Sequence, residues 1–154
     1  MRERLMNALK EAMKAKETRR ISTIRMVQAA IKDLDIASRT KADPTVTDGD
    51  IASLLSKLVK QREESAKIYD EGGRPELAAQ EREEIAIISE FMPKQLSEAE
   101  VIEVIKHIIH EVGATSIKDM GKCMALLKER YPGQLDFAKA SGQIKALLSQ
   151  GNID

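Results

Sequence analysis

Apolar residues recur every three or four positions along most of the chain, which is the spacing of one face of an α-helix. The clearest example runs from Asp48 to Glu71. The apolar positions on its one side are Ile51, Leu54, Leu55, Leu58, Ala66 and Tyr69. No long stretch alternates apolar and polar residues as a β-strand does. The pattern therefore predicts an all-α protein.

Prolines, glycines and capping residues divide the chain into seven predicted helices. All four prolines fall between periodic stretches, as expected of a residue that cannot continue a helix. Four helices are predicted over about residues 2–16, 18–37, 48–71 and 75–91, with Thr47 as a cap for the third. Three more are predicted to begin after the caps Ser97, Ser116 and Asp136.

The segment from Met92 to Leu96, which contains Pro93, is the predicted domain boundary. Four helices precede it and three follow it. The sequence therefore predicts an N-terminal helical bundle over residues 1–92 and a small C-terminal three-helix domain over residues 93–154. The length of 154 residues fits one domain or two small ones.

Charge is balanced overall but unevenly distributed. Lys and Arg number 25, as do Asp and Glu. Residues 1–40 carry ten basic residues against five acidic ones, and residues 41–92 carry seven against twelve. Such a pattern indicates either a face for a polyanion or helices that pair with each other. We favour pairing, including for the cluster Arg19, Arg20 and Arg25.

Composition limits the classes of function. Two tyrosines and two phenylalanines are too few for binding single-stranded nucleic acid by base stacking. The one cysteine, Cys123, excludes an internal disulfide and is expected to be a small buried hydrophobe. No apolar run approaches the ~18 residues that span a bilayer. Acidic residues among the basic ones of the first segment argue against a signal or transit peptide, so we expect a cytoplasmic protein.

The sequence gives little evidence for catalytic or metal-binding residues. His107 and His110 lie three residues apart beside Glu111, but no third strong ligand accompanies them, and we expect surface histidines. The run Glu81, Glu83 and Glu84 is expected to be a solvated helix face. No nucleophile with a base and an orienting group can be assembled. We therefore predict no catalytic residue, no metal site and no cofactor.

Two glycines, Gly121 and Gly142, fall inside predicted helices, where each costs about 1 kcal/mol relative to Ala. One explanation is close packing of helices, and another is the close approach of a partner's backbone. Phosphate is a natural partner because four lysines lie nearby. The candidate nucleic-acid-binding residues are Lys118, Gly121, Lys122, Lys139 and Lys145. Contacts of this kind recognise the shape and charge of structured RNA rather than its bases.

Three ordered motifs resemble the GatB/YqeY-like family, and together they span most of the chain. The first is Gln61-Arg62-Glu63-Glu64-Ser65, followed by Tyr69, Gly72-Gly73-Arg74 and Glu76-Leu77-Ala78. The second is Phe91-Met92-Pro93-Lys94-Gln95-Leu96-Ser97-Glu98. The third runs from Gly113 to Lys122 as Gly-Ala-Thr-Ser-Ile-Lys-Asp-Met-Gly-Lys, followed by Met124.

The resemblance implies an all-helical domain like the C-terminal tail of the B subunit of the tRNA-dependent amidotransferase. In that enzyme the tail contacts the tRNA body, and other parts carry out the chemistry. The resemblance thus implies a tRNA-facing helix at Asp119-Met120-Gly121-Lys122. Residues 128–142 differ from the basic stretch of many members and are less positively charged.

We therefore expect a non-catalytic tRNA-binding accessory protein, linked to tRNA-dependent amidation or aminoacylation. Its expected partners are tRNA and an aminoacyl-tRNA synthetase or amidotransferase, with no membrane or DNA partner. The alternative is a helical module for protein–protein interaction, in which the lysines are merely solvated. A carbon–nitrogen ligase with glutamine as amide donor is a further, weaker alternative.

Overall fold

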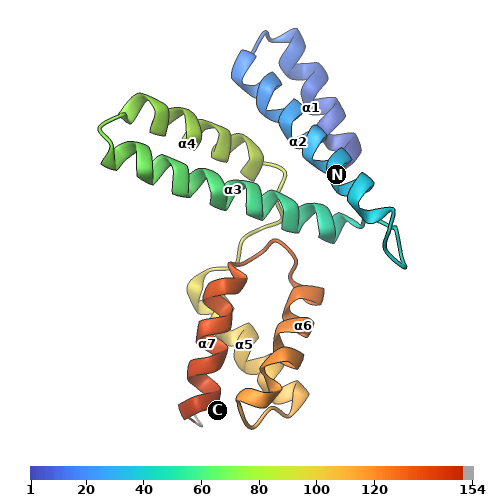
Figure 1. Cartoon of the computed structure of the whole chain (residues 1–154), viewed down its shortest axis with the longest axis vertical. Coiled ribbons are helices and arrows are strands. Elements are labelled where there is room, and N and C mark those ends of the chain that lie inside the picture. The colour runs from blue at the N-terminus through green and yellow to red at the C-terminus, as the bar shows by residue number, and fades with distance from the viewer. Residues whose placement is uncertain (151–154) are drawn as a thin grey trace. The chain divides into compact units, whose positions relative to one another are not determined.

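The structure, a computed structural model, describes residues 1–150 and is helical throughout, with no strand in that range (Figure 1). Its elements are α1 (Arg2–Lys14), α2 (Thr18–Ser38), α3 (Asp48–Glu71), α4 (Pro75–Ser89), α5 (Glu98–Val112), the 3₁₀ turn η1 (Ile117–Asp119), α6 (Met120–Arg130) and α7 (Phe137–Gln150). The prediction of an all-α protein is confirmed. None of these helices is both long and apolar enough to cross a membrane.

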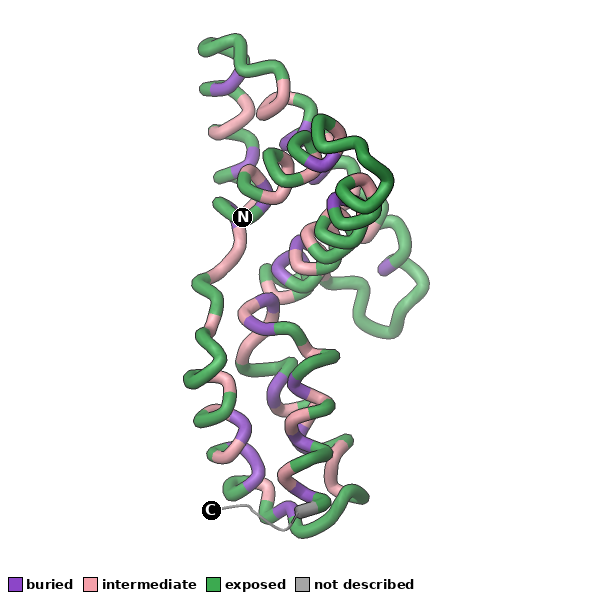
Figure 2. Tube along the Cα trace, turned by 90° about the vertical axis from the view of Figure 1, so that its left-hand side faces the viewer, coloured by how far each residue is buried: buried purple, intermediate pink, exposed green. Residues whose placement is uncertain are grey.

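The chain divides into two compact units, Met1–Met92 and Pro93–Asp154, called unit 1 and unit 2 below. Each unit has its own cluster of buried apolar side chains. Buried positions alternate with exposed ones along the helices (Figure 2), as one-sided burial of an amphipathic helix requires.

Unit 1 consists of two helical hairpins. Helix α1 packs on α2, α3 packs on α4, and α2 also contacts α4. Its core residues are Leu5, Ile24, Val27, Ile31, Ile51, Leu55, Ile88 and Phe91. The two ends of the unit meet at Arg4, whose Nη2 donates to the carbonyl oxygen of Glu90 at 3.0 Å. The same guanidinium lies 5.7 Å from the centre of the Phe91 ring.

The boundaries of α3 follow from local chemistry. At its start the Asp50 amide donates to Thr47 Oγ1 at 3.1 Å, and the Thr47 amide donates to Asp50 Oδ2 at 2.9 Å. This reciprocal pair satisfies two backbone donors that the first turn leaves open. After its last residue Glu71, Gly73 takes a φ of +72°, which glycine adopts without steric cost. The predicted bounds of this helix are confirmed.

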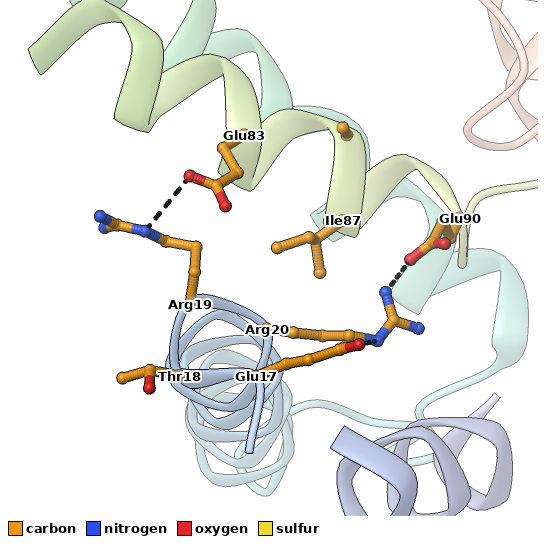
Figure 3. Close-up of a pocket in the computed structure, with 8 residues that line it drawn as sticks. Glu17, Thr18, Arg19, Arg20, Glu83, Ile87 and Glu90 are labelled. Carbon is orange, nitrogen blue, oxygen red and sulfur yellow. Dashed lines mark hydrogen bonds and ion pairs between the residues drawn. The ribbon is translucent and has the colours of Figure 1, made fainter. Parts of the chain in front are cut away.

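Ion pairs join the helices of unit 1. Arg19 Nε lies 3.6 Å from Glu83 Oε2, and Arg20 pairs with Glu90, so α2 is tied to α4 on two sides of Ile87 (Figure 3). The expected pairing of Arg19 and Arg20 is thus confirmed. The same expectation is wrong for Arg25, whose Nη2 instead lies 4.0 Å from the sulfur of Met13.

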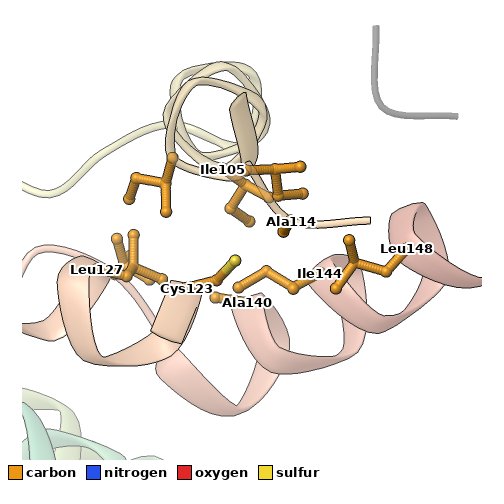
Figure 4. Close-up of a cluster of buried hydrophobic side chains, with 10 residues drawn as sticks. Ile105, Ala114, Cys123, Leu127, Ala140, Ile144 and Leu148 are labelled. Atoms are coloured by element: carbon orange, nitrogen blue, oxygen red, sulfur yellow. The ribbon is translucent and has the colours of Figure 1, made fainter. Parts of the chain in front are cut away.

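Unit 2 is a three-helix bundle in which α5, α6 and α7 all contact one another. Its buried residues are Ile105, Ile108, Ile109, Ala114, Cys123, Leu127, Leu135, Ala140, Ile144 and Leu148, most of them visible in Figure 4. Cys123 has no exposed surface, which confirms its expected role as a small buried hydrophobe. Helix α5 begins with a reciprocal Ser97–Glu100 pair and is followed by Gly113 at a φ of +70°.

Three details differ from the sequence prediction. The helical periodicity places Met13 with Leu5 on one face of the first helix and Ile117 with Leu127 on one face of the sixth, but Met13 and Ile117 are 49% and 46% exposed. The sixth helix does not begin directly after Ser116 but at Met120, after the 3₁₀ turn. There Asp119 Oδ2 accepts from the amides of Thr115 and Ser116 at 3.0 and 3.4 Å, and this holds the chain in the tighter turn.

Candidate nucleic-acid interface

Charge is segregated between the helices of unit 2. Helices α6 and α7 together carry five basic residues and one acidic residue, whereas α5 carries four acidic residues and one basic residue. The basic residues are Lys122, Lys128, Arg130, Lys139 and Lys145. Because α6 and α7 bury their apolar sides against α5, their outer sides carry the lysines among these residues, whereas Arg130 pairs with Glu111 of α5. We call their exposed residues, together with Lys118, the α6–α7 surface.

All five predicted binding residues lie on the α6–α7 surface. Lys118 is in the 3₁₀ turn, Gly121 and Lys122 are in the first turn of α6, and Lys139 and Lys145 are on α7; each is exposed. Helix α7 contacts both the 3₁₀ turn and α6. The fold therefore brings α7 beside the 3₁₀ turn and α6, which follow each other directly in the sequence.

Most lysines of this surface form no ion pair with the described residues. Among the described residues, Lys118, Lys122 and Lys145 take part in no ion pair. Lys139 Nζ lies 3.9 Å from Glu98 Oε1, but the two side chains are 74% and 91% exposed, and such exposed pairs are weak. These ammonium groups can therefore meet a phosphate without first breaking a strong internal interaction.

The carboxylate of the neighbouring acidic residue, Asp119, accepts hydrogen bonds from backbone amides. Hydrogen bonding from the Thr115 amide lowers the pKa of Asp119, with further lowering from the Ser116 amide and the charge of Lys122. Its carboxylate is thus held as an anion that organises the turn before α6.

The two helix glycines have no packing role. A Cβ atom built on Gly121 or Gly142 would meet nothing within 4 Å, and neither residue has a positive φ. The explanation by close packing of helices is therefore wrong for both. Around Gly142 the exposed positions of α7 carry only small residues and lysines: Ala138, Lys139, Lys145, Ala146 and Ser149. The result is a flat surface over which a partner can approach the helix backbone.

Other candidate groups offer little chemistry. Burial, with a contribution from the charge of Asp119, raises the pKa of the Cys123 thiol, which disfavours the reactive thiolate. His107 and His110 are exposed on α5, as expected. Among residues 1–150 no group of three or more His, Cys, Asp or Glu side chains is placed to hold a metal ion.

Two glutamates of the run on α4 form ion pairs that the sequence analysis did not predict. Glu83 pairs with Arg19, and Glu84 Oε2 lies 3.1 Å from Arg62 Nε. The side chains of Arg62 and Glu84 are only 18% and 25% exposed. These carboxylates join helices of unit 1, so a purely solvated face is the wrong description for this run.

One feature of unit 2 was missed by the sequence analysis. A pocket of about 460 Å³ is lined by Gln95, Leu96, Glu98, Val101, Ile102, Gln134, Leu135, Asp136, Lys139 and Gln143. Ile102, which the helical periodicity places in the core stripe, is 39% exposed there. Gln143 gives no signal in the sequence, because a single amide on a helix is unremarkable until the fold buries it.

Comparison with known proteins identifies the family. A family model described as "Yqey-like protein" matches residues 2–148. The chain belongs to the Yqey-like family. The resemblance deduced from the three motifs is thereby confirmed.

Curated relatives of this Yqey-like protein bear the name "Altered inheritance of mitochondria protein 41, mitochondrial". The protein of Clavispora lusitaniae is 32% identical over 108 residues, 69% of this chain and 61% of that protein. That of Pyrenophora tritici-repentis is 30% identical, over 82% of this chain and 71% of the relative. That of Saccharomyces cerevisiae strain YJM789 is also 30% identical, over 84% and 66%. The chain thus spans about two thirds of the length of these relatives.

The names of these relatives correct one expectation. All three are named as mitochondrial proteins. The expectation of a cytoplasmic protein, which rested on composition and on the absence of a targeting pattern, is contradicted by this finding. Composition carries little information about compartment, because a folded domain can keep the same surface wherever it is delivered.

Proposed function

We propose that this Yqey-like protein binds tRNA through the α6–α7 surface and acts as a non-catalytic accessory in a tRNA-dependent step, amidation or aminoacylation. The observation that carries the proposal is the segregation of charge in unit 2. Five basic residues and one acidic residue lie on α6 and α7, and three lysines of the surface have no ion-pair partner among the described residues.

The chemistry of this surface suits phosphate rather than base edges. Lysine is a flexible point charge that can follow a backbone of phosphates without demanding a fixed geometry. The flat region around Gly142 lets a sugar–phosphate backbone come close to the helix. Folded RNA presents phosphates in a fixed arrangement, so shape and charge together provide selectivity.

An accessory role follows from what the family resemblance implies. In the amidotransferase the corresponding tail contacts tRNA while other parts carry out the reaction. By this proposal the protein presents or retains tRNA for a partner that is an aminoacyl-tRNA synthetase or an amidotransferase. A carbon–nitrogen ligase activity of the chain itself would require a site of converging polar groups, for which the described residues give no support.

The proposal is tested by fluorescence anisotropy with folded tRNA at several salt concentrations. We expect saturable binding that weakens as salt rises, because each phosphate neutralised by a lysine releases counterions. Lys122→Glu is expected to weaken binding about tenfold, since one phosphate contact is lost and a repulsion is added. Lys32→Glu, on an exposed position of α2, makes the same change of charge in unit 1 and is expected to have little effect.

Two results would contradict the proposal. Equal losses of affinity for Lys122→Glu and Lys32→Glu would indicate a response to net charge rather than a defined surface. The absence of tRNA binding even at low salt would overturn the proposal as a whole.

A second candidate, docking of a protein partner on unit 1, is supported by exposed apolar side chains. Met6 and Met13, 47% and 49% exposed, are seven residues apart and so share a face of α1. Ile68 on α3 is 65% exposed. Substitution of both methionines by Gln would abolish capture of such a partner and leave tRNA binding unchanged.

A further inference from the structure

The pocket beside Gln143, called the Gln143 pocket below, lies where two connecting segments meet the first turns of α5 and α7. The Leu96 amide donates to the Gln134 carbonyl oxygen at 2.9 Å, and Gln95 Nε2 donates to the Gly133 carbonyl oxygen at 2.6 Å. These bonds hold residues 95–96 against residues 133–134. The walls of the pocket are therefore fixed by the backbone and do not depend on a ligand to form.

The floor of the Gln143 pocket is apolar. Leu96, Val101, Ile102 and Leu135 line it. Ile102 is 39% exposed although it lies in the first half of α5, whose other apolar residues are largely covered. Covering exposed apolar surface of this kind with a flat apolar group lowers the free energy. The pocket thus offers aliphatic contact to one face of a ligand.

The polar groups of the pocket are two carboxylates, three glutamine amides and the ammonium group of Lys139. Gln143 Oε1 is buried and has no hydrogen-bond partner among the described residues. The carboxylates of Glu98 and Asp136 also line the pocket, and Asp136 Oδ1 accepts from the Ala138 amide at 2.9 Å. A buried acceptor without a donor is unfavourable. A ligand that brings N–H groups would remove this cost.

The mouth of the pocket adjoins the α6–α7 surface through Lys139. Lys139 lines the pocket and precedes Gln143 by four residues on α7, so the two side chains lie on the same side of the helix. The contact of Lys139 with Glu98 is long, at 3.9 Å, and exposed. The ammonium group can therefore turn to a phosphate while Gln143 engages another part of the same ligand.

We propose that the Gln143 pocket receives one unpaired nucleobase of the RNA that binds to the α6–α7 surface. The face of the base covers Ile102, its edge donates hydrogen bonds to Gln143, and its phosphate lies against Lys139. This inference rests on the proposed function, and it adds base recognition to a surface that otherwise recognises phosphate. Unpaired bases in loops are where RNA sequence is read.

The buried Gln143 Oε1, which lacks a donor among the described residues, favours a base over an aliphatic side chain of a peptide. An aliphatic group would cover the floor but leave Gln143 Oε1 without a donor. Among bases, guanine has two adjacent donors on its Watson–Crick edge, N1–H and the exocyclic amine, which match neighbouring acceptors. A single base held by its edge and an aliphatic floor does not require the aromatic platforms that this chain lacks.

The first arm of the test compares two RNAs of equal length, a hairpin with an unpaired G-containing loop and a fully paired duplex. Gln143→Leu keeps the size of the side chain and removes the amide. We expect it to weaken hairpin binding about five- to tenfold, the effect of losing a good hydrogen bond, and to leave duplex binding unchanged. Gln80→Leu, on an exposed position of α4, is the matched control and is expected to change neither.

The second arm uses the unmodified full-length chain and small probes. Guanosine 5′-monophosphate at millimolar concentration is expected to shift the NMR signals of the Gln143 side-chain amide and the Ile102 methyl groups. Ribose 5-phosphate, which lacks the base, is expected to leave them in place. Equal shifts with both probes would overturn the proposal in favour of a simple phosphate site.

The two arms separate this inference from the proposed function. If hairpin and duplex bind equally and Gln143→Leu affects neither, the pocket proposal fails while RNA binding stands. If no RNA binds but guanosine 5′-monophosphate still shifts the pocket signals, the base pocket stands and the proposed function fails. If neither RNA nor nucleotide acts on unit 2, both fail. Shifts produced by an aliphatic peptide but not by the nucleotide would assign the pocket to a protein partner.

Discussion

The two units of this protein use their charged residues differently. In unit 1, arginines pair with carboxylates of neighbouring helices, as Arg2 does with Asp35 and Arg62 with Glu84. In unit 2, Lys118, Lys122 and Lys145 form no ion pair within the described chain. Arginine suits the first task because its planar fork binds a carboxylate through two donors, whereas lysine suits a surface that meets a mobile or varied anion.

The charged residues of the two units therefore differ in their structural role. Arginines of unit 1 contribute to the packing of its own helices, as Arg130 does in unit 2 by pairing with Glu111, whereas the lysines of the α6–α7 surface contribute little to the packing of unit 2. The zero net charge of the chain hides this difference, because it adds internal pairs and unpaired lysines together. The following predictions test the contrast, from the largest expected effect to the smallest.

Truncation of a core leucine tests whether the units are separately stabilised. Leu55 of unit 1 and Leu127 of unit 2 have no exposed surface, so each change to Ala is expected to cost about 2–5 kcal/mol of unfolding free energy. Because the cores are separate, we expect each loss in the hydrogen-exchange protection of its own unit. Equal loss of protection in both units after Leu55→Ala would contradict this expectation.

Removal of the Arg62 charge in unit 1 is expected to lower stability, whereas removal of the Lys122 charge in unit 2 is not. Arg62 donates to Glu84 and, through Nη1, to the Leu58 carbonyl oxygen at 3.1 Å. Arg62→Ala leaves the partly buried Glu84 carboxylate without this donor and is expected to cost about 1–3 kcal/mol. Lys122→Ala is expected to stay within about 0.5 kcal/mol of the parent while weakening tRNA binding. Urea unfolding measures both.

A double-mutant cycle gives the control for Arg62. Combining Arg62→Ala with Glu84→Gln should recover part of the loss, because the uncompensated carboxylate is then removed. Fully additive losses would show that the ion pair does not stabilise unit 1.

Glycine substitutions are expected to act in opposite directions in the two units. Gly142 lies inside α7 with open space around it, so Gly142→Ala is expected to raise the unfolding free energy by up to about 1 kcal/mol. Gly73 has a φ of +72°, so Gly73→Ala is expected to lower it by about 1–2 kcal/mol. Thermal unfolding checks both signs.

The RNA affinity of the Gly142→Ala variant tests whether this glycine serves contact with RNA. If the flat surface serves backbone contact, Gly142→Ala should stabilise unit 2 and weaken RNA binding at the same time. A variant that gains stability and keeps full affinity would remove Gly142 from the interface.

Local signals in the sequence predict much of this fold. The bounds of α3 follow from Thr47, Asp50 and the glycines after Glu71, since caps and stops act through neighbouring residues. The start of α6 was predicted about three residues too early, because Ser116 and Asp119 cap a 3₁₀ turn that precedes the α-helix. Periodicity also cannot tell which edge of an apolar stripe a neighbouring helix covers, and this is why Ile102 and Ile117 were placed in the core.

The candidate site is less predictable because its properties depend on contacts between distant segments. The lysines can be counted in the sequence, but only the fold shows that Lys139 meets Glu98 while Lys145 meets no carboxylate of the described residues. The Gln143 pocket requires segments 95–96 and 133–134 to join before its amide becomes buried. No pattern along α7 alone contains that information.

The contact of Arg4 with Glu90 and Phe91 brings the first helix of unit 1 to the point where the chain leaves it. A unit whose entry and exit are adjacent can be inserted into a loop of another protein without stretching its host. It can also be circularly permuted by a short linker across this junction, with new ends opened at the turn between α3 and α4. Unit 1 therefore has the geometry of a domain that can be inserted into other proteins.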